Sequence, residues 1–447
     1  MPHDLNHLTQ ALLSAAKAAG ADSADALAVA GQSLSIDIRQ GKLEQAERAE
    51  GVEVGLRVMI GRRQACVSAS DISAATFARL AERAVAMAAE APEDETVGLA
   101  SPDQLAQGWD MAALEMADPG AEPTARALED AARRAEAAAL AAGGITQVEA
   151  SSSYSNRAMH LAASNGFSGG YGRTSHSVSA VAFTGSGTGM ERDWAAEGRI
   201  FAADMPSADS IGQLAAERAL MRAGAVKPPT GAFPVLFDER IASSIVGHLL
   251  MAVNGASIVR GTSWARDKLG QQILPKGISI IEDPHRSRIA GSRPFDAEGL
   301  PTRRRALVED GVLMGWTLDL ANARKLGLQS TGNAARGTSA PPSPATTNID
   351  LTQGSASRDD LLRQMGTGLL VTSLIGSTIN PTTGDYSRGA SGFWVEGGEI
   401  RYPVNECTIA GNLLEMLMRL TPANDAKAHH STRVPSLLIE GLMLAGG

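Results

Sequence analysis

The segment 241–255 reads as an apolar helix that carries side chains able to do chemistry. Ser244 and His248 lie four positions apart, so on a helix they share roughly one face. A serine beside a histidine can form a nucleophile and its general base, but this segment holds no Asp or Glu to orient the imidazole. The alternative is structural, with the Ser244 hydroxyl bonded to a carbonyl of its own helix.

His248 has a second interpretation, as a metal ligand. At about 100° per residue it falls on the helix face of Ile245 and Ala252, which predicts a buried ring satisfied by a backbone carbonyl. Zinc needs several protein ligands, and His248 forms no His-x-His or His-x-x-x-His pair with another histidine. Spacing alone therefore predicts no metal site on this helix.

A second group of polar residues lies in the segments 330–333, 346–348 and 383–389. Glycines and small polar residues let a backbone approach a ligand closely, and extended peptides bind strand edges through main-chain hydrogen bonds. These residues are candidates for a peptide groove, with structural turns as an equal alternative. The candidates are Asn333, Asn348, Asp385, Ser387 and Arg388.

The composition argues against nucleic-acid and membrane partners. The 447 residues carry a formal net charge of −9, whereas nucleic-acid binding needs clustered Lys and Arg. Apolar stretches stay shorter than the roughly 18 residues of a membrane span, and the first residues do not resemble a signal peptide. Cys66 and Cys407 lie far apart and suit a reducing compartment. We expect a cytoplasmic protein.

The elements that must position the candidate residues fall into two halves. In the first half, period-two alternation predicts strands within 33–69 and 145–184, and alanine-rich patterns predict helices at 73–91 and 122–142. Lys227-Pro228-Pro229-Thr230 reads as an extended linker. We predict an α+β fold of two domains: an N-terminal α/β domain with antiparallel strands and helices, residues 1–226, and a β-rich C-terminal domain with short helices, residues 231–447.

The second half has its own local signals. Asp310-Gly311 and Gly397-Gly398 are typical of hairpin tips. Residues 330–355, with three prolines, predict a long irregular loop, and loops of that length are usually functional. Short helices are predicted at 319–326, 358–365 and 408–420.

Several of these segments together resemble a known family. They include Thr383–Ile400, which reads TGDYSRGASGFWVEGGEI, the segment Pro294–Gly299, and Ala323–Asn333. The chain is similar over nearly its whole length, most clearly from Gly231 onward, to the TldD/PmbA family, peptidase U62, once labelled modulators of DNA gyrase. The resemblance implies an N-terminal α/β domain and a β-rich C-terminal domain.

The resemblance also implies which branch of the family this is. TldD-type subunits carry a His-Glu-x-x-x-His helix, and a later cysteine completes a zinc site. His248 matches the second histidine, whereas Ser243 replaces the first and Ser244 replaces the glutamate. Residues 423–435 contain no cysteine, and Cys407 is not at the matching place. The chain therefore resembles the TldE (PmbA) branch, for which no catalytic residue and no metal ligand are expected.

The leading hypothesis is a TldE-type subunit of a heterodimeric zinc metalloprotease that acts on flexible peptides. The zinc is then expected in the TldD-type partner, and no cofactor in this chain. The histidine spacing alone is uninformative, because five residues on a helix turn the side chain about 140° off-face. An autonomous hydrolase using Ser244 and His248, and a non-catalytic scaffold, are the alternatives. A homodimer is the alternative assembly of the chain alone.

Overall fold

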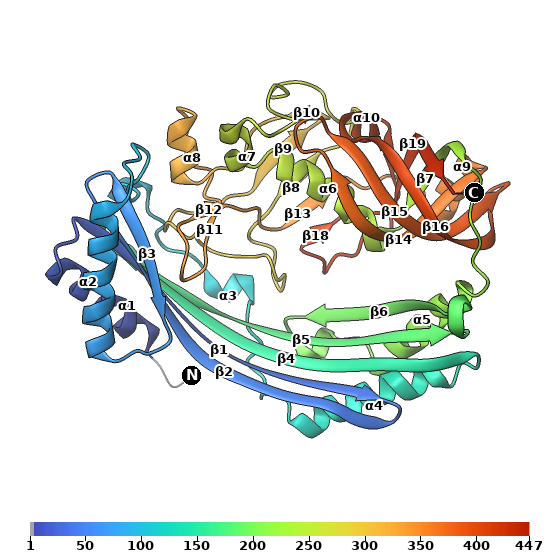
Figure 1. The fold of residues 1–447 in the computed structure, drawn as a ribbon, viewed down its shortest axis with the longest axis horizontal. Coiled ribbons are helices and arrows are strands. Elements are labelled where there is room, and N and C mark those ends of the chain that lie inside the picture. The colour runs from blue at the N-terminus through green and yellow to red at the C-terminus, as the bar shows by residue number, and fades with distance from the viewer. Residues whose placement is uncertain (1–3, 447) are drawn as a thin grey trace.

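The computed structural model describes residues 4–446, and the ends of the two predicted domains, residues 1–3 and 447, lie outside them. Its first half is one long antiparallel sheet, with the strand order β3-β2-β1-β4-β5-β6 (Figure 1). The left-handed residues Gln40 and Gly41, with φ of 53° and 67°, reverse the chain between β1 and β2. The strands are β1 (Ser23–Arg39), β2 (Lys42–Ile60), β3 (Arg63–Ala69), β4 (Ile145–Ala163), β5 (Ser168–Thr184) and β6 (Glu191–Arg199).

Two pairs of helices cover this sheet, one toward each end of its long strands (Figure 1). Side chains of Asp4, Ser73, Thr124 and Ser207 cap the four helices by accepting backbone N–H bonds. Alanine-rich faces let the helices pack close to the strands, which explains how a core with few aromatics is filled. The helices are α1 (Leu5–Ala18), α2 (Ala74–Glu90), α4 (Ala125–Leu140) and α5 (Ala208–Met221), with short α3 (Met111–Leu114), η1 (Pro102–Gln104), η2 (Gly187–Gly189) and η3 (Ala202–Asp204) between them.

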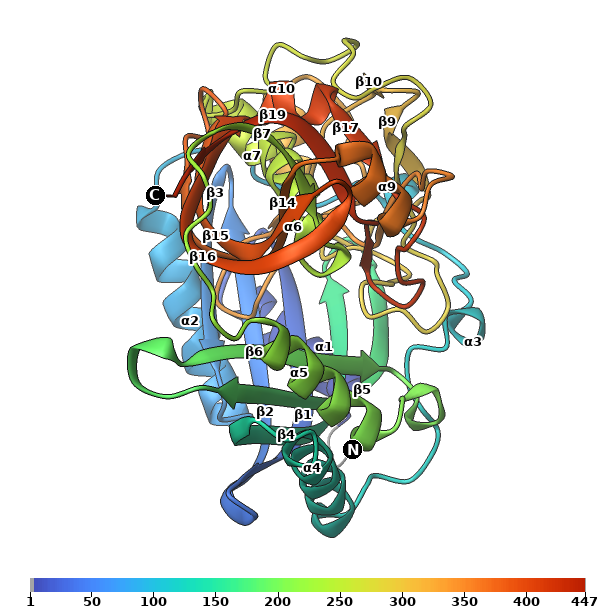
Figure 2. The same cartoon turned by 90° about the vertical axis from the view of Figure 1, so that its right-hand side faces the viewer.

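The second half contains a closed barrel. Its strands follow the order β16-β15-β14-β7-β19, and an additional pairing of β16 with β19 closes the ring (Figure 2). The first strand of this half therefore pairs with its last strand. The barrel strands are β7 (Gly231–Phe237), β14 (Gly368–Ile379), β15 (Asp385–Glu396), β16 (Glu399–Asn412) and β19 (Leu437–Ala445), with β17 (Leu420–Pro422) paired to β19.

A smaller sheet and short helices complete the second half. The sheet order is β10-β9-β8-β13-β18, and a separate pair of strands is formed by β11 and β12. The strands are β8 (Ile280–Glu282), β9 (Arg305–Glu309), β10 (Val312–Leu313), β11 (Ala334–Ala335), β12 (Ser343–Pro344), β13 (Ile349–Leu351) and β18 (Thr432–Arg433). The helices are α6 (Glu239–Ala252), α7 (Gly255–Arg260), α8 (Leu320–Lys325), α9 (Arg358–Met365) and α10 (Leu413–Met418).

The predicted α+β class is confirmed, and two local predictions are corrected. The predicted helix 408–420 is wrong in its first part, because residues 408–410 continue β16 and pair with β15 and β19 before α10 begins. The apolar segment 241–255 is not one helix, since Asn254 caps the separate helix α7. The long loop 330–355 holds only the short strands β11, β12 and β13. No helix among residues 4–446 is both long and apolar enough to cross a membrane.

Buried charges join the two halves. Arg57 of β2 donates from Nε to Asp25 of β1 over 2.7 Å, and Arg336, from the loop after β11, pairs with the same carboxylate. The side chains of all three are at most 5% exposed. Burial disfavours the charged form of Asp25, but the guanidiniums of Arg336 and Arg57 lower its pKa below the ordinary value. These ion pairs fix the loop after β11, in the second half, to the sheet of the first half.

Candidate functional site

Helix α6 belongs to the second half and meets strand β6 of the first half, where Arg240 pairs with Asp193. One face of the helix is buried and another is partly open. Asp238 caps its start and accepts from the backbone N–H of Arg240 over 3.2 Å. The inner face is apolar and buried, which fixes the rotation of the helix. That inner face consists of Ala242, Ile245, Val246, Leu249 and Ala252. The positions 243, 244, 247 and 248 consequently lie at the side of the helix that is partly open.

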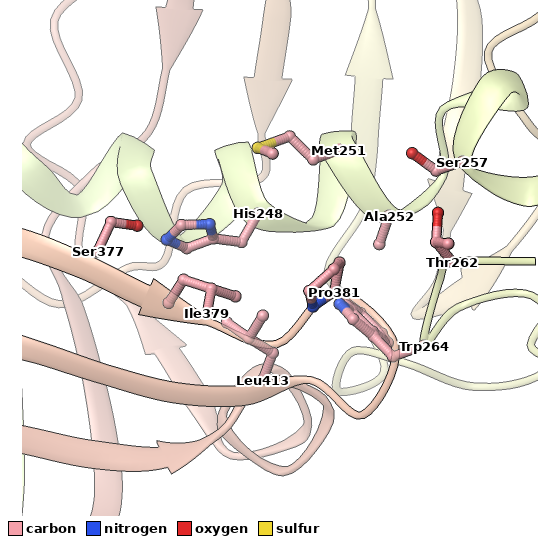
Figure 3. Close-up of a pocket in the computed structure, with 10 residues that line it drawn as sticks. All are labelled: His248, Met251, Ala252, Ser257, Thr262, Trp264, Ser377, Ile379, Pro381 and Leu413. Atoms are coloured by element: carbon pink, nitrogen blue, oxygen red, sulfur yellow. The ribbon is translucent and has the colours of Figure 1, made fainter. Parts of the chain in front are cut away.

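Two cavities flank α6. The first, of about 220 Å³, lies beside His248 and is walled mostly by apolar side chains, among them Trp264, Ile379 and Leu413 (Figure 3). The second, of about 400 Å³, lies against Ser243, Ser244 and Gly247; we call it the serine cavity. Its other walls come from β6, β14, β15 and β18, so both halves of the chain contribute to it. The remaining lining residues are Trp194, Arg240, Ile241, Leu250, Thr372, Ser373, Leu374, Arg388 and Thr432.

The environment of His248 differs from the sequence prediction. Its ring is half-buried and lies edge-to-face on Tyr386, with 5.8 Å between the ring centroids. Within residues 4–446, the buried Nε2 of His248 and the buried hydroxyl of Tyr386 have no hydrogen-bond partner. The predicted bond to a backbone carbonyl is therefore wrong, because apolar side chains face the ring instead (Figure 3). Burial, and then the charge of Arg388, lower the pKa of His248 below its ordinary value, which favours the neutral imidazole.

Ser244 behaves as the structural interpretation predicts. Its Oγ donates to the carbonyl oxygen of Ile241 over 2.7 Å, which is a bond within its own helix. Ser244 lines the serine cavity, whereas His248 lines the separate cavity of about 220 Å³. The two side chains are not joined by a hydrogen bond among the residues described. The geometry gives no support to a Ser244–His248 nucleophile and base.

The residues around α6 do not fit a zinc ion. Apart from the imidazole of His248, the described linings of both cavities contain no carboxylate, thiol or second imidazole. Cys407 is buried in β16, where its thiol donates to the carbonyl of Ala390 over 3.2 Å and burial raises its pKa to about 11. Across residues 4–446, no three His, Cys, Asp or Glu side chains gather closely enough to hold a metal.

The five polar candidates lie in different places. Asn333 and Asn348 are buried: Nδ2 of Asn333 donates to Glu282 over 2.7 Å, and Nδ2 of Asn348 donates to Ser292 over 2.8 Å. Asp385 accepts from Thr383 over 2.6 Å in the turn that enters β15. Ser387 is half-buried in the same strand. Only Arg388 reaches a described cavity at α6.

Sequence reasoning missed the contribution of the first half to this site. Trp194 of β6 is 46% exposed and lines the serine cavity, although it lies far from α6 in sequence. Next to it, Asp193 is buried and pairs with Arg240 of α6 over 3.1 Å. The alternation of residues along β6 predicts that Asp193 and Trp194 lie on opposite faces of the strand. It does not predict which other element packs against either face, so the contact with α6 could not be foreseen.

Comparisons with known proteins cover the chain from residue 24 to residue 446. Models described as PmbA/TldA metallopeptidase domain 1, central domain and C-terminal domain match residues 24–88, 118–223 and 230–446. Metalloprotease PmbA of Escherichia coli O157:H7 is 36% identical over 415 residues, which cover 92% of this chain and 90% of that protein.

Solved structures share the fold throughout. The chain resembles a crystal structure from Bacteroides thetaiotaomicron that is described as a modulator of DNA gyrase, with a TM-score of 0.93, 26% identity and all of both chains covered. TldE from Thermococcus kodakarensis matches with a TM-score of 0.85 and covers 98% of this chain and 99% of that chain. At 20% identity, this second likeness concerns the fold alone.

Proposed function

Because this chain belongs to the PmbA/TldD family of metallopeptidases, we propose that it is the TldE/PmbA-type, non-catalytic subunit of a two-subunit peptidase. The observation that carries the proposal is the donor set at α6. Among the described residues that line the two cavities, His248 is the one metal-binding side chain, and Ser243 and Ser244 occupy the positions where a ligand and a base are expected in the sister subunit. Zinc held by a TldD-type partner would supply the activated water.

In this proposal the chain binds and orients peptide while the partner cleaves it. Flexible peptides are the expected substrates, and the reducing cytoplasm suits a chain with two free cysteines. The half-buried His248, whose pKa is lowered by burial, forms part of the wall of a cavity (Figure 3). The alternative of an autonomous hydrolase has no support in the geometry, because the Ser244 hydroxyl bonds to its own helix.

Metal content and complex formation test the proposal. The purified chain should bind far less than one zinc per subunit, and it should form a one-to-one complex with a TldD-type protein from the same organism on size exclusion. Stoichiometric, tightly held zinc in the isolated chain would overturn the non-catalytic assignment. A failure to form any complex would overturn the partnership and favour the scaffold alternative.

Peptide cleavage separates the remaining alternatives. A flexible peptide should be cleaved by the mixture of the two proteins and left intact by this chain alone. The His248→Ala variant serves as the control for an autonomous active site. Cleavage by the isolated chain that His248→Ala abolishes would establish the hydrolase alternative instead.

A further inference from the structure

The serine cavity has the size and position of a ligand site. Its volume of about 400 Å³ falls within the range of about 300–1,000 Å³ that is typical of small-molecule pockets. It lies between β6 of the first sheet and α6 and β14 of the second half, and β6 is the strand of that sheet nearest the barrel (Figure 1). A ligand bound there would touch both halves of the chain.

The charge of the cavity is positive and comes from Arg388. The other lining arginine, Arg240, is already paired with Asp193 and Asp238, each 3.1 Å away, and these carboxylates also pair with Arg222 and Arg358. Arg388 uses Nε to donate to the carbonyl of Gly376 over 2.8 Å, and among the residues described no carboxylate lies within ion-pair distance of its guanidinium. Two guanidinium nitrogens therefore remain available beside a cavity whose described lining contains no acidic residue.

The walls offer two further kinds of contact. Ser243, Ser373 and Thr432 bring hydroxyl groups that can donate to or accept from a peptide backbone. Trp194, which is 46% exposed, and the half-buried Leu374 form an apolar wall. An indole with this much exposure inside an interdomain cavity is the kind of surface that binds an apolar side chain.

We propose that the serine cavity binds a peptide through a carboxylate on Arg388 and an adjacent apolar side chain on Trp194. A guanidinium with a free pair of N–H donors matches the two oxygens of a carboxylate. A single unpaired arginine in a chain of net charge −9 does not suit a polyanion such as a nucleic acid. The carboxylate can come from a peptide C-terminus or from an Asp or Glu side chain, since both present the same group.

The proposed peptide site rests on the proposed function, in which α6 has no metal ligands. The cavity beside Ser243 and Ser244 would then bind substrate and hold no metal. It requires no partner subunit, so it can be tested on the isolated chain. Failure of peptide binding by the isolated chain would overturn this inference and leave complex formation untouched. If no complex with a TldD-type protein forms but the isolated chain still binds the peptide, the proposed function is overturned and the peptide site stands.

The experiment compares three short peptides that differ only in their carboxylate. Isothermal titration calorimetry with the isolated chain would measure the dissociation constants of three peptides. They are N-acetylated Ala-Ala-Leu with a free C-terminus, its C-terminal amide, and the C-terminal amide of N-acetylated Ala-Asp-Leu. The free acid should bind at least about tenfold more tightly than the first amide if the site reads a C-terminus. The Asp peptide should regain that affinity if the site reads a side chain. Equal affinity, or no binding, of all three would overturn the proposal.

Variants locate the binding in the cavity. Arg388→Gln should lower the affinity for the carboxylate peptides about tenfold or more and leave the weak binding of the amide unchanged. Arg388→Lys should retain part of the affinity, because the charge remains and the paired donors are lost. Trp194→Ala should lower the affinity for all three peptides by a similar factor. Arg62→Gln, at an exposed arginine after β2, is the matched control, and thermal unfolding checks that every variant is folded. Unchanged binding by Arg388→Gln would overturn the proposal.

Discussion

Asp25 is the residue on which the contact between the N-terminal sheet and the loop after β11 depends. Its carboxylate is the counter-charge for the buried Arg57 and Arg336. Asp25→Asn removes that charge and should lower the free energy of unfolding by about 3–5 kcal/mol, because two buried guanidiniums lose their partner. Urea denaturation measures the change. Asp37→Asn, on the same strand, is the control and should have a small effect; equal losses in both variants would contradict this role.

Glu298 gives the stability of the protein a pH dependence. Burial, and then the nearby Asp296, raise the pKa of Glu298 from 4.5 to about 8. The folded protein therefore keeps a proton that the unfolded chain releases, so stability falls as pH rises from about 4.5 toward 8. Glu298→Gln should flatten this fall, which reaches at most about 1.4 kcal/mol per pH unit for one proton.

Urea midpoints at several pH values between 5 and 9 would measure the Glu298→Gln effect. The buried carboxyl accepts from the backbone N–H of Leu320 over 2.9 Å, and a glutamine oxygen can keep that bond. Glu309→Gln, at an exposed position of β9, is the control. A wild-type slope that persists in Glu298→Gln would assign the pH dependence to other groups.

The environment of a single residue could be predicted where it depends only on neighbours in the sequence. The bond of Ser244 to its own helix follows from its position in an apolar helix, and the structure confirms it. The unpartnered Nε2 of His248 was not predictable, because what faces the ring comes from residues 377–381, more than a hundred positions away. The same holds for Trp194, whose role depends on where the first sheet meets α6.

At the scale of elements, strand β2 has a position where only glycine fits. A Cβ on Gly55 would overlap the carbonyl of Thr338 and lie 2.7 Å from its Cα, in the loop that carries Arg336. Gly55→Ala should therefore push this loop off the sheet and lower the free energy of unfolding by about 1–3 kcal/mol. Thermal unfolding, with limited proteolysis of the segment 336–343, would detect both effects.

Gly51 provides the matched control for Gly55. It lies on the same strand, and a Cβ there meets no described atom within 4 Å. Gly51→Ala should leave both stability and proteolysis nearly unchanged. Equal responses of the two variants would mean that the cost comes from the strand itself, and the close approach of the loop would not explain it.

Elements with a strong periodic pattern were well predicted. The predicted helix 358–365 has the bounds of α9, and Asp310-Gly311 and Gly397-Gly398 do form hairpin tips. The error at 408–420 arose because the break between the apolar residues of β16 and those of α10 is only Gly411-Asn412, where Asn412 caps the helix. Short apolar runs of this kind fit a strand as well as a helix.

At the scale of the whole molecule, the two halves are held together by more than the linker at 227–230. After α5, Arg222 donates to Asp193 over 2.8 Å and to Ser391 of the barrel over 2.8 Å. Cleavage at a protease site introduced in this linker should therefore leave the two fragments associated on size exclusion. The same sample in strong urea is the control for complete cleavage. Fragments that separate without denaturant would show that the interface is weak.

The α+β class was predictable from the mixture of periodicities, whereas the closure of the barrel was not. Each barrel strand can be predicted from its own alternation of apolar and polar residues. β7 and β19, however, are separated by about two hundred residues, and alternation does not indicate which strands pair over that distance. The pairing of β16 with β19 that closes the ring spans the shorter interval 413–436, but α10, β17 and β18 lie within it, so no hairpin signal marks this pair.

That closure sets the order in which the protein can mature during synthesis. β7 leaves the ribosome early in the second half, yet its antiparallel neighbour, residues 437–445, is the last strand to be translated. Until then β7 and β16 keep open edges that can pair with other chains, and the long sequence separation makes the final step slow. A premature stop even shortly before residue 437 would remove β19 and leave a barrel that cannot close.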